Sequence, residues 1–296
     1  MSNQTLKAYG QIHLAVLLYG LTAILGDVIA LSAVMIVWWR VLITSISLFF
    51  LIKMGKTLIG LSPRLIKIYG GIGVLIALHW ITFYGSIKLA NASVALICFS
   101  TTALFTAILE PIITKKPFNK LDLSLAMIII PGMWMVVAGT DASMHLGIAV
   151  GLISALLIAV FAILNKIHIE GSDQYTISFI EMFSATIFIT LLLPFLFMYG
   201  DDIAFLPPRQ IDWIYLLIMS LLCTTLAYVL SLKALRYISA FAINLVFNLE
   251  PIYGIILAVF ILNEQKELSA GFYLGSFIII ASIIIYPLMK HRYQKS

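Results

Sequence analysis

Long apolar runs separated by short polar breaks constrain this sequence more than any other feature. About 20 apolar residues suffice to cross a bilayer as a helix. Dividing the chain at polar, Gly- or Pro-bearing breaks predicts ten helices, at residues 9–29, 31–52, 66–88, 92–113, 121–139, 146–167, 174–199, 211–234, 239–262 and 269–289. Of the 296 residues, 62% are hydrophobic and only 10% are charged, whereas soluble domains average about 25% charged residues. We therefore expect an all-α integral membrane protein with ten transmembrane helices.

The basic residues predict how the chain is oriented in the membrane. With a cytoplasmic N-terminus, 14 of the 18 Lys and Arg residues fall in cytoplasmic segments, three fall in outer loops, and Arg40 lies within the second helix. Cytoplasmic loops carry such an excess of positive charge. We expect a multi-pass protein of the cell (inner) membrane with both termini in the cytoplasm. The net charge of +5 is spread over loops of one membrane face, so no nucleic-acid partner is expected.

The second half of the sequence matches the first at a constant offset of 148 residues. The matched pairs are Lys88 with Arg236, Ala92 with Ala240, Phe99 with Phe247, Phe105 with Tyr253, and Lys116 with Glu264. Two sets of five helices enter the membrane from opposite sides, because five is odd. We therefore expect two inverted five-helix repeats, residues 1–142 and 143–296, around a central cavity. Inverted repeats with a polar site near the bilayer midplane are typical of secondary transporters.

Residues 239–264 form an apolar stretch that nevertheless carries Asn244, Asn248 and Glu250 near its middle, followed by Pro251. Polar and ionisable groups are expensive at this depth and rarely face lipid, and a proline frees a backbone carbonyl. The pattern favours a helix beside a water- or ligand-filled cavity. Asn244 and Asn248, four residues apart, share one helix face and can bind a zwitterion or a sugar. The alternative is that they join neighbouring helices.

Glu250 is the most informative of these groups. A lone carboxylate in this setting is either protonated or paired with a cation, and we expect Arg40 of the second helix to be its partner. The functional interpretation is proton coupling or binding of a substrate ammonium group. The alternative is a structural Arg40–Glu250 pair.

The third expected helix carries a second set of candidates. His79 lies near its middle and either binds a substrate group or proton, or makes an interhelical hydrogen bond that contributes roughly 1 kcal/mol. Trp80 and Tyr84 lie on the adjacent stripe of the same helix surface and are either cavity walls or packing residues. Tyr228 lies 148 residues after Trp80 and is a plausible opposite wall of the cavity.

Other polar and reactive residues allow simpler interpretations. Glu181, in the seventh helix, either lines the cavity or reaches the cytoplasmic interface. Glu110 is expected to form a salt bridge with Lys115 or Lys116. Cys98 and Cys223 fall in apolar segments and are interpreted as small buried hydrophobes. No metalloprotease, serine hydrolase or phosphate-loop motif occurs, so we expect no metal, no cofactor and no enzymatic activity.

Several motifs resemble the EamA-type drug/metabolite transporter superfamily. They are Tyr19 and Gly20, Trp39 and Arg40, residues 234–240, and Pro251 with Glu264 thirteen residues later. These resemble the family's entry motif, the opening of its ninth helix, and that helix's proline and closing acid. The first half departs from the pattern with Ala103 and Lys116, which implies functionally unequal halves. Residues 79–84 are also similar to the third helix of YddG-like aromatic amino acid exporters.

The resemblance implies a ten-helix transporter in which helices one to four and six to nine line a central cavity, with helices five and ten at the periphery. The predicted function is a secondary transporter that exports small amphipathic metabolites such as amino acids by alternating access, with or without proton coupling. The alternatives are a membrane sensor that binds without transporting and an intramembrane lipid-handling enzyme. The predicted substrate-binding residues are Arg40, His79, Trp80, Tyr84, Tyr228, Asn244, Asn248 and Glu250.

Overall fold

The computed structural model describes residues 3–51, 61–119, 123–124, 127–168, 173–199, 204–235, 237, 246–247 and 249–293, and the regular elements in these ranges are helices. The first half contains α1 (Asn3–Val28), α2 (Ala33–Leu51), α4 (Pro63–Leu89), α5 (Ala92–Ser100), α6 (Thr102–Thr114) and α8 (Ile129–Ala138). The short 3-10 turn η1 (Ala142–Met144) precedes α9 (His145–His168), α10 (Gln174–Tyr199), α11 (Gln210–Leu217), the π-helical η3 (Ile218–Leu226) and α12 (Ala227–Leu235). The last elements are α14 (Glu250–Leu257), the π-helical η4 (Ala258–Leu262), the 3-10 turn η5 (Glu264–Lys266) and α15 (Ala270–Tyr293).

Seven continuous helical stretches among the described residues are long and apolar enough to cross a membrane. They are Gln4–Val28, Ala33–Leu51, Pro63–Leu89, Ala92–Thr114, Ala142–His168, Tyr175–Met198 and Gln210–Ser231. Three shorter apolar helices, Ile129–Ala138, Glu250–Leu262 and Ala270–Ser282, fall within the other three expected spans. The prediction of an all-helical, multi-pass membrane protein is confirmed.

Local side-chain caps set several helix boundaries. The Ser62 side chain accepts a hydrogen bond from the Leu65 amide at the start of α4, with Pro63 in the first turn. Asn91 accepts from the Val94 amide in the same way at the start of α5. Helix α6 ends where Lys115 adopts a left-handed conformation with φ of 55°. Most starts lie within a few residues of the expected ones, because the same residues that break the apolar pattern cap the helices.

Helix α1 is the clearest departure, since it begins at Asn3 rather than at residue 9. The extra turns are stabilised by tertiary packing. Ala8 and Ile12 are fully buried in one apolar cluster with Ala227 and Ala234 of α12. The polar composition of the first residues concealed this buried face.

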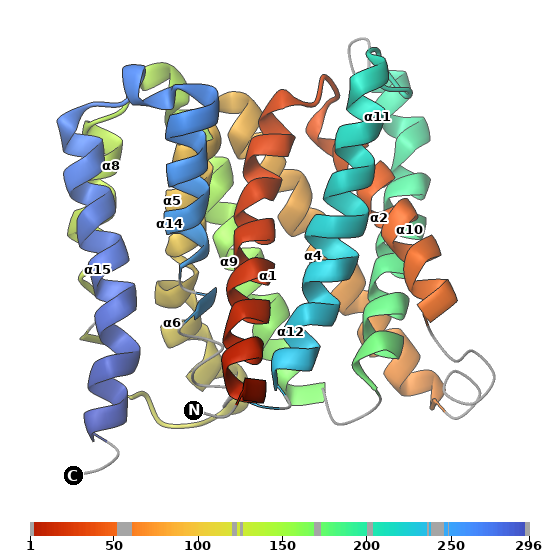
Figure 1. Ribbon diagram of the computed structural model, residues 1–296, viewed down its shortest axis with the longest axis horizontal. Coiled ribbons are helices and arrows are strands. Elements are labelled where there is room, and N and C mark those ends of the chain that lie inside the picture. The colour runs from red at the N-terminus through yellow and green to blue at the C-terminus, as the bar shows by residue number, and fades with distance from the viewer. Residues whose placement is uncertain are drawn as a thin grey trace.

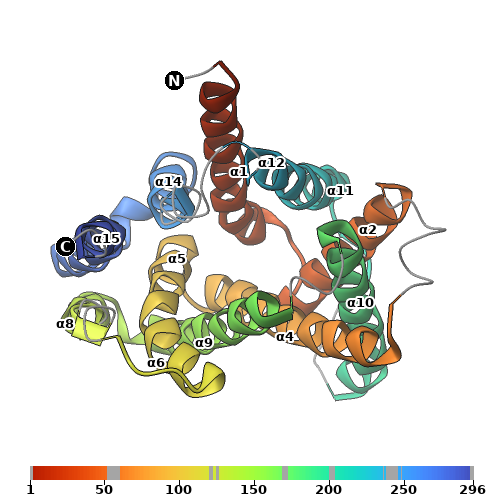
Figure 2. The same ribbon diagram turned by 90° about the horizontal axis from the view of Figure 1, so that it is seen from below.

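The helices stand side by side in one bundle, and α1 begins at the same end of the bundle at which α15 finishes (Figure 1). Seen along the helices, α8 and α15 lie together at one edge, outside the arrangement of α1, α2, α4, α5, α9, α10, α12 and α14 (Figure 2). The packing agrees, because α15 contacts α8 and α5. The fifth and last expected spans thus lie at the periphery.

The packing partners recur with the two halves exchanged. Helix α1 packs on α12 and α14, and its counterpart in the second half, α9, packs on α4, α5 and α6. Helix α2 packs on α11 and η3, and its counterpart, α10, packs on α4. Helix α2 also contacts α10, and α5 contacts α14. The last two contacts join helices that hold the same place in the two halves. Each of the other contacts has a counterpart in which the two halves are exchanged. The bundle core is consequently built from both halves.

Glycines allow the closest helix crossings between the halves. At Gly20 of α1, an added Cβ would lie 3.0 Å from the backbone nitrogen of Gly254 in α14. At Gly73 of α4, an added Cβ would lie against the backbone of Glu181 in α10, 2.9 Å from its Cα and 3.0 Å from its carbonyl carbon. Backbone atoms cannot move aside as a flexible side chain can. Gly73 therefore fixes how closely α4 and α10 approach.

This crossing predicts the effect of Gly73→Ala. The added methyl should force α4 and α10 apart and lower the free energy of unfolding by about 1–3 kcal/mol, as overpacking does. Gly71→Ala is the matched control on the same helix, because nothing lies within 4 Å of its added Cβ; it should be neutral or slightly stabilising. Thermal unfolding of the purified proteins in detergent measures both. Equal melting temperatures for the two variants would contradict the crossing.

Candidate functional site

Arg40 lies at the centre of the polar interactions between the two halves. Its side chain is only 4% exposed. Its Nη1 donates to the Tyr84 hydroxyl at 2.6 Å, and its Nε donates to Thr224 Oγ1 at 3.0 Å. Its guanidinium carbon lies 3.9 Å from the centroid of the Trp80 ring. Arg40 thus joins α2, α4 and η3 around one buried positive charge.

The partners of Arg40 are themselves held in place. The Tyr84 side chain is fully buried, and its hydroxyl donates to Met219 Sδ at 3.5 Å. The Thr224 hydroxyl donates to the Met219 carbonyl, five residues earlier, at 2.8 Å. This contact belongs to the π-helical η3, a geometry often found at functional positions.

The Arg40 site suits recognition of an anion attached to an apolar group. A planar guanidinium is the preferred partner of carboxylates, and it stacks on aromatic faces. Trp80 covers one side of this guanidinium, while Tyr84 and Thr224 hold two of its donors. These contacts fix the orientation of the charge. Arg40, Trp80 and Tyr84, three of the predicted site residues, therefore lie together.

The expected direct pairing of Arg40 with Glu250 is not found. Among the described residues, ion pairs shorter than 4.0 Å join Lys166 to Glu110 and Arg209 to Asp212. Glu250 interacts with Arg40 electrostatically from a greater distance. Arg40 instead satisfies its donors with neutral hydroxyl groups of α4 and η3. Glu250 begins α14 and lies at the Gly20–Gly254 crossing, where its carbonyl oxygen would be 3.3 Å from a Cβ on Gly20.

His79 is engaged in helix packing. Its side chain is 4% exposed, and its Nδ1 lies 3.0 Å from the Ser154 carbonyl oxygen and 2.9 Å from Ser154 Oγ. Ser154 Oγ also donates to the His79 carbonyl at 3.1 Å. These contacts join α4 to α9, as the packing alternative requires. A substrate contact by His79 stays a prediction.

Tyr228 and Glu181 form a second polar group, on α12 and α10. The Tyr228 ring meets the Tyr175 ring edge to face at 6.4 Å, and Tyr228 interacts electrostatically with Glu181. Glu181 is 3% exposed, the Asn165 side chain faces its carboxyl group, and its Oε1 has no hydrogen-bond partner. The remaining two candidates, Asn244 and Asn248, lie outside the described residues.

The sequence left two interpretations of Glu181 open, a cavity-lining position and a position at the cytoplasmic interface. The signal that points to its burial is a single carboxylate in a long apolar helix. Nothing in the local sequence shows that Oε1 lacks a partner, since this depends on α4, α9 and α12. Glu110 also departs from expectation, because it pairs with Lys166 of α9 at 2.5 Å instead of with Lys115 or Lys116.

An apolar cavity of about 310 Å³ lies away from Arg40, between α6, α8 and α9. Its walls are Thr101, Leu104, Phe105, Ile129, Ile130, Met133, Trp134, Val137 and Leu152. These residues carry no charge with which to orient a polar ligand. In the part of the chain that the structure describes, no group of three His, Cys, Asp or Glu side chains is suited to hold a metal ion.

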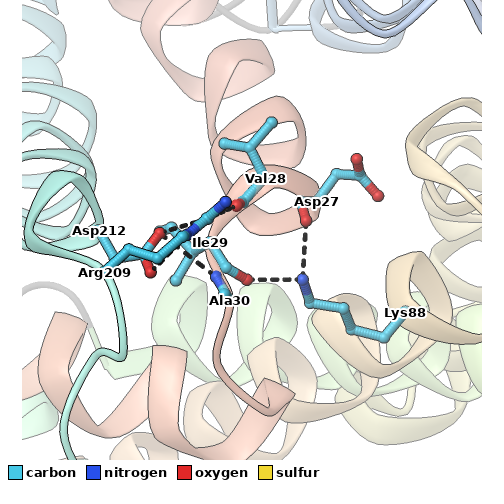
Figure 3. A network of polar contacts seen from close by, with 7 residues as sticks. All are labelled: Asp27, Val28, Ile29, Ala30, Lys88, Arg209 and Asp212. Carbon is cyan, nitrogen blue, oxygen red and sulfur yellow. Dashed lines mark hydrogen bonds and ion pairs between the residues drawn. The ribbon is translucent and has the colours of Figure 1, made fainter.

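Charged groups cap the end of α1, at the bundle end opposite its start (Figure 1). Lys88 Nζ donates to the carbonyls of Asp27 and Ile29, each at 2.8 Å, and Arg209 donates to the Val28 carbonyl (Figure 3). Arg209 also binds the Asp212 carboxylate, with distances of 2.6 and 3.1 Å. Because the last carbonyls of a helix lack internal partners and attract cations, these contacts stabilise the α1 terminus.

Glu264 caps the start of α5 from the other half of the chain. Its Oε1 accepts from the Ala92 amide at 2.8 Å, and its Oε2 accepts from the Ser93 amide at 2.9 Å. Burial raises the pKa of this carboxyl group above its ordinary value, and the hydrogen bonds from Ser93 and Ala92 oppose that shift. The acid expected to close the ninth helix therefore stabilises the N-terminus of α5.

Glu264→Gln should lower the free energy of unfolding by about 1–3 kcal/mol. A glutamine offers one acceptor oxygen for two backbone donors, so one buried N–H loses its partner. Glu267→Gln is the matched control, because Glu267 is exposed and keeps an oxygen for its contact with Asn91. Thermal unfolding in detergent compares them. An unchanged melting temperature for Glu264→Gln would show that the cap contributes little.

Comparisons with known proteins agree with this architecture. Residues 6–138 and 145–286 each match the EamA-like transporter family. An uncharacterized transporter of Clostridium kluyveri is 27% identical over 228 residues, which is 75% of this chain and 71% of that protein. Another from Archaeoglobus fulgidus is 25% identical over 214 residues, or 70% and 71% of the two chains. A solved crystal structure shares the fold with a TM-score of 0.64 at 12% identity, covering 99% of each chain. The family match spans nearly the whole sequence, and the chain belongs to the EamA-like transporter family.

Proposed function

We propose that this protein is a secondary transporter that exports small amphipathic metabolites, such as amino acids, by alternating access. The observation that carries the proposal is the buried Arg40 guanidinium, which is held by Tyr84 of α4 and Thr224 of η3. A charge is expensive within a membrane and typically marks a substrate or ion pathway. Membership in the EamA-like transporter family supports the transport role.

The proposed architecture is ten membrane spans in two inverted repeats, residues 1–142 and 143–296. The exchanged packing partners support it, as do the two separate family matches, over 6–138 and 145–286. Helix α2 begins at Ala33 and α10 begins at Gln174, a shift of 141 residues, whereas the residue pairs matched in the sequence further along are shifted by 148. Alternating access would then arise as one half rocks against the other around the Arg40 site.

The proposed substrate class follows from the chemistry at Arg40. A carboxylate would bind the guanidinium, and an apolar side chain would lie along aromatic rings such as Trp80. Glu250 would bind a substrate ammonium group or a proton. Tyr228, His79, Asn244 and Asn248 complete the proposed wall. The excess of basic residues in alternate loops supports cytoplasmic termini and a place in the cell membrane.

The decisive experiment is counterflow in proteoliposomes with a mixture of radiolabelled L-amino acids. A transporter exchanges external label for unlabelled amino acids inside a sealed vesicle, whereas a sensor or enzyme does not. We expect label to accumulate transiently in vesicles that contain the protein and not in empty vesicles. Absence of counterflow for every amino acid in the mixture would contradict the proposed substrate class.

Arg40→Met separates substrate binding from packing. The hydrogen-bond partners of Arg40 are neutral hydroxyl groups that each keep a second partner at Met219, so an apolar side chain of similar length leaves no buried ion pair broken. The melting temperature should therefore be unchanged or higher. Counterflow should nevertheless fall at least about tenfold, the equivalent of one lost interaction of about 1.4 kcal/mol. Arg64→Met, at an exposed position on α4, is the matched control and should transport normally. Normal counterflow by Arg40→Met would exclude a direct role for this residue.

Glu250→Gln tests the second charged group. The amide keeps the size of the side chain but can neither ionise nor take up a proton, so transport should be abolished while expression and melting temperature stay unchanged. Counterflow and thermal unfolding on the same preparation measure the two effects. If this variant transports normally, both the coupling role and the cation-binding role of Glu250 are wrong.

A further inference from the structure

Glu181 is a buried carboxyl group that the architecture does not otherwise use. Its side chain is 3% exposed, and Oε1 has no hydrogen-bond partner. The ion pairs among the described residues do not include it. An ionised carboxylate in this position would be desolvated without a counter-ion, which is costly in a membrane protein. A proton on the carboxyl group removes that cost.

The groups around Glu181 are polar but neutral. They are Asn165 of α9, Tyr69 of α4 and Tyr228 of α12. The Tyr69 hydroxyl is already committed to the His168 carbonyl at 2.8 Å, and the Tyr228 ring meets Tyr175 of α10 itself. On the other packed helix, α2, Arg40 is held by Tyr84 and Thr224. No neighbour among the described residues thus supplies a positive charge within ion-pair distance.

The surroundings of Glu181 are linked to the contact between the halves. Its backbone lies against Gly73, at a close contact between α10 and α4. Helix α10 belongs to the second half and α4 to the first. A movement that separates the halves must open this crossing, and it would admit water to the carboxyl group. Hydration favours the ionised form, so the same movement that opens the site would release the proton.

Glu181 also occupies the position that corresponds to Arg40. Helices α2 and α10 contact each other through Ser45 and Thr186, whose hydroxyl oxygens are 3.4 Å apart and whose numbers differ by 141. Arg40 and Glu181 differ by the same amount. Each interacts with one member of the matched aromatic pair: the Arg40 guanidinium lies over the Trp80 ring, and Glu181 interacts electrostatically with Tyr228. One half thus buries a cation with its partners, and the other buries an acid without a counter-ion.

From these observations we infer that Glu181, rather than Glu250, is the proton-binding group that couples transport to a proton gradient, which leaves Glu250 the ammonium-binding role; the inference rests on the transport function proposed above. A proton from the water on one side adds to a carboxylate oxygen of Glu181. The halves then move, and the proton leaves to water on the other side; no other bond forms or breaks. His79 is less suited to this role, because its Nδ1 is bonded to Ser154.

Glu181→Gln tests the inference by two readouts. In proteoliposomes, the wild-type protein should accumulate the radiolabelled L-amino acid mixture when a pH gradient is imposed. The variant should still exchange label when no gradient is imposed. Its accumulation under a gradient should fall to the level that the wild-type protein shows without one. In infrared spectra, the carbonyl stretch of a protonated carboxylic acid should be weaker in the variant. Asp141→Asn, in the exposed turn before α9, is the control and should behave as the wild type in both.

Glu181→Asp keeps a carboxyl group and guards against a folding defect in the glutamine variant. It should retain both the infrared band and the response to the gradient. Gradient-driven accumulation by a folded Glu181→Gln variant, or an infrared band of unchanged intensity, would overturn the inference. A wild-type protein without counterflow would instead contradict the proposed function, and the infrared band would still report whether Glu181 holds a proton.

Discussion

A bilayer supplies no hydrogen bonds, so each buried charge and helix end in this protein must be satisfied by the protein itself. Arg40 shows the constraint most clearly. Its charge lies on α2, and its partners come from α4 of the first half and from η3 of the second. The helices must therefore pack in a particular arrangement for the charge to be tolerated. The same arrangement assembles the candidate substrate site, so the packing that makes the buried charge tolerable also builds the proposed site.

The contacts between the halves differ at the two ends of the bundle. At one end, Glu264 caps α5 and Arg209 caps α1, each from the opposite half. The Glu264 carboxylate is buried and makes two hydrogen bonds to backbone amides, and hydrogen bonds to charged groups are the stronger kind. The Lys166–Glu110 ion pair joins α9 and α6 elsewhere, with a lysine side chain that is 73% exposed. Exposed pairs contribute only about 0–1 kcal/mol.

Departures from regular α-helix occur where the polar side chains matter. The π-helical η3 contains Thr224, whose hydroxyl reaches back to the Met219 carbonyl and also accepts from Arg40. A regular helix would advance these residues differently around its axis and turn Thr224 away from that carbonyl. The second π-helical segment, η4, is followed by Asn263 in a left-handed conformation, directly before Glu264. Local irregularity thus positions both the Arg40 partner and the α5 cap.

The sequence by itself determined the membrane environment, the helical class and most helix positions, because the length and spacing of apolar runs are local properties that a bilayer enforces. It also singled out Arg40, and separately Trp80 and Tyr84, as candidates, because a charge or aromatic stripe within an apolar helix is visible without a structure. Only the tertiary structure decided the partners. Arg40 bonds Thr224, 184 residues away, in place of Glu250, and Glu110 pairs with Lys166 in place of the adjacent lysines. Helical periodicity specifies which face a side chain occupies, whereas the crossing of helices specifies what that face meets.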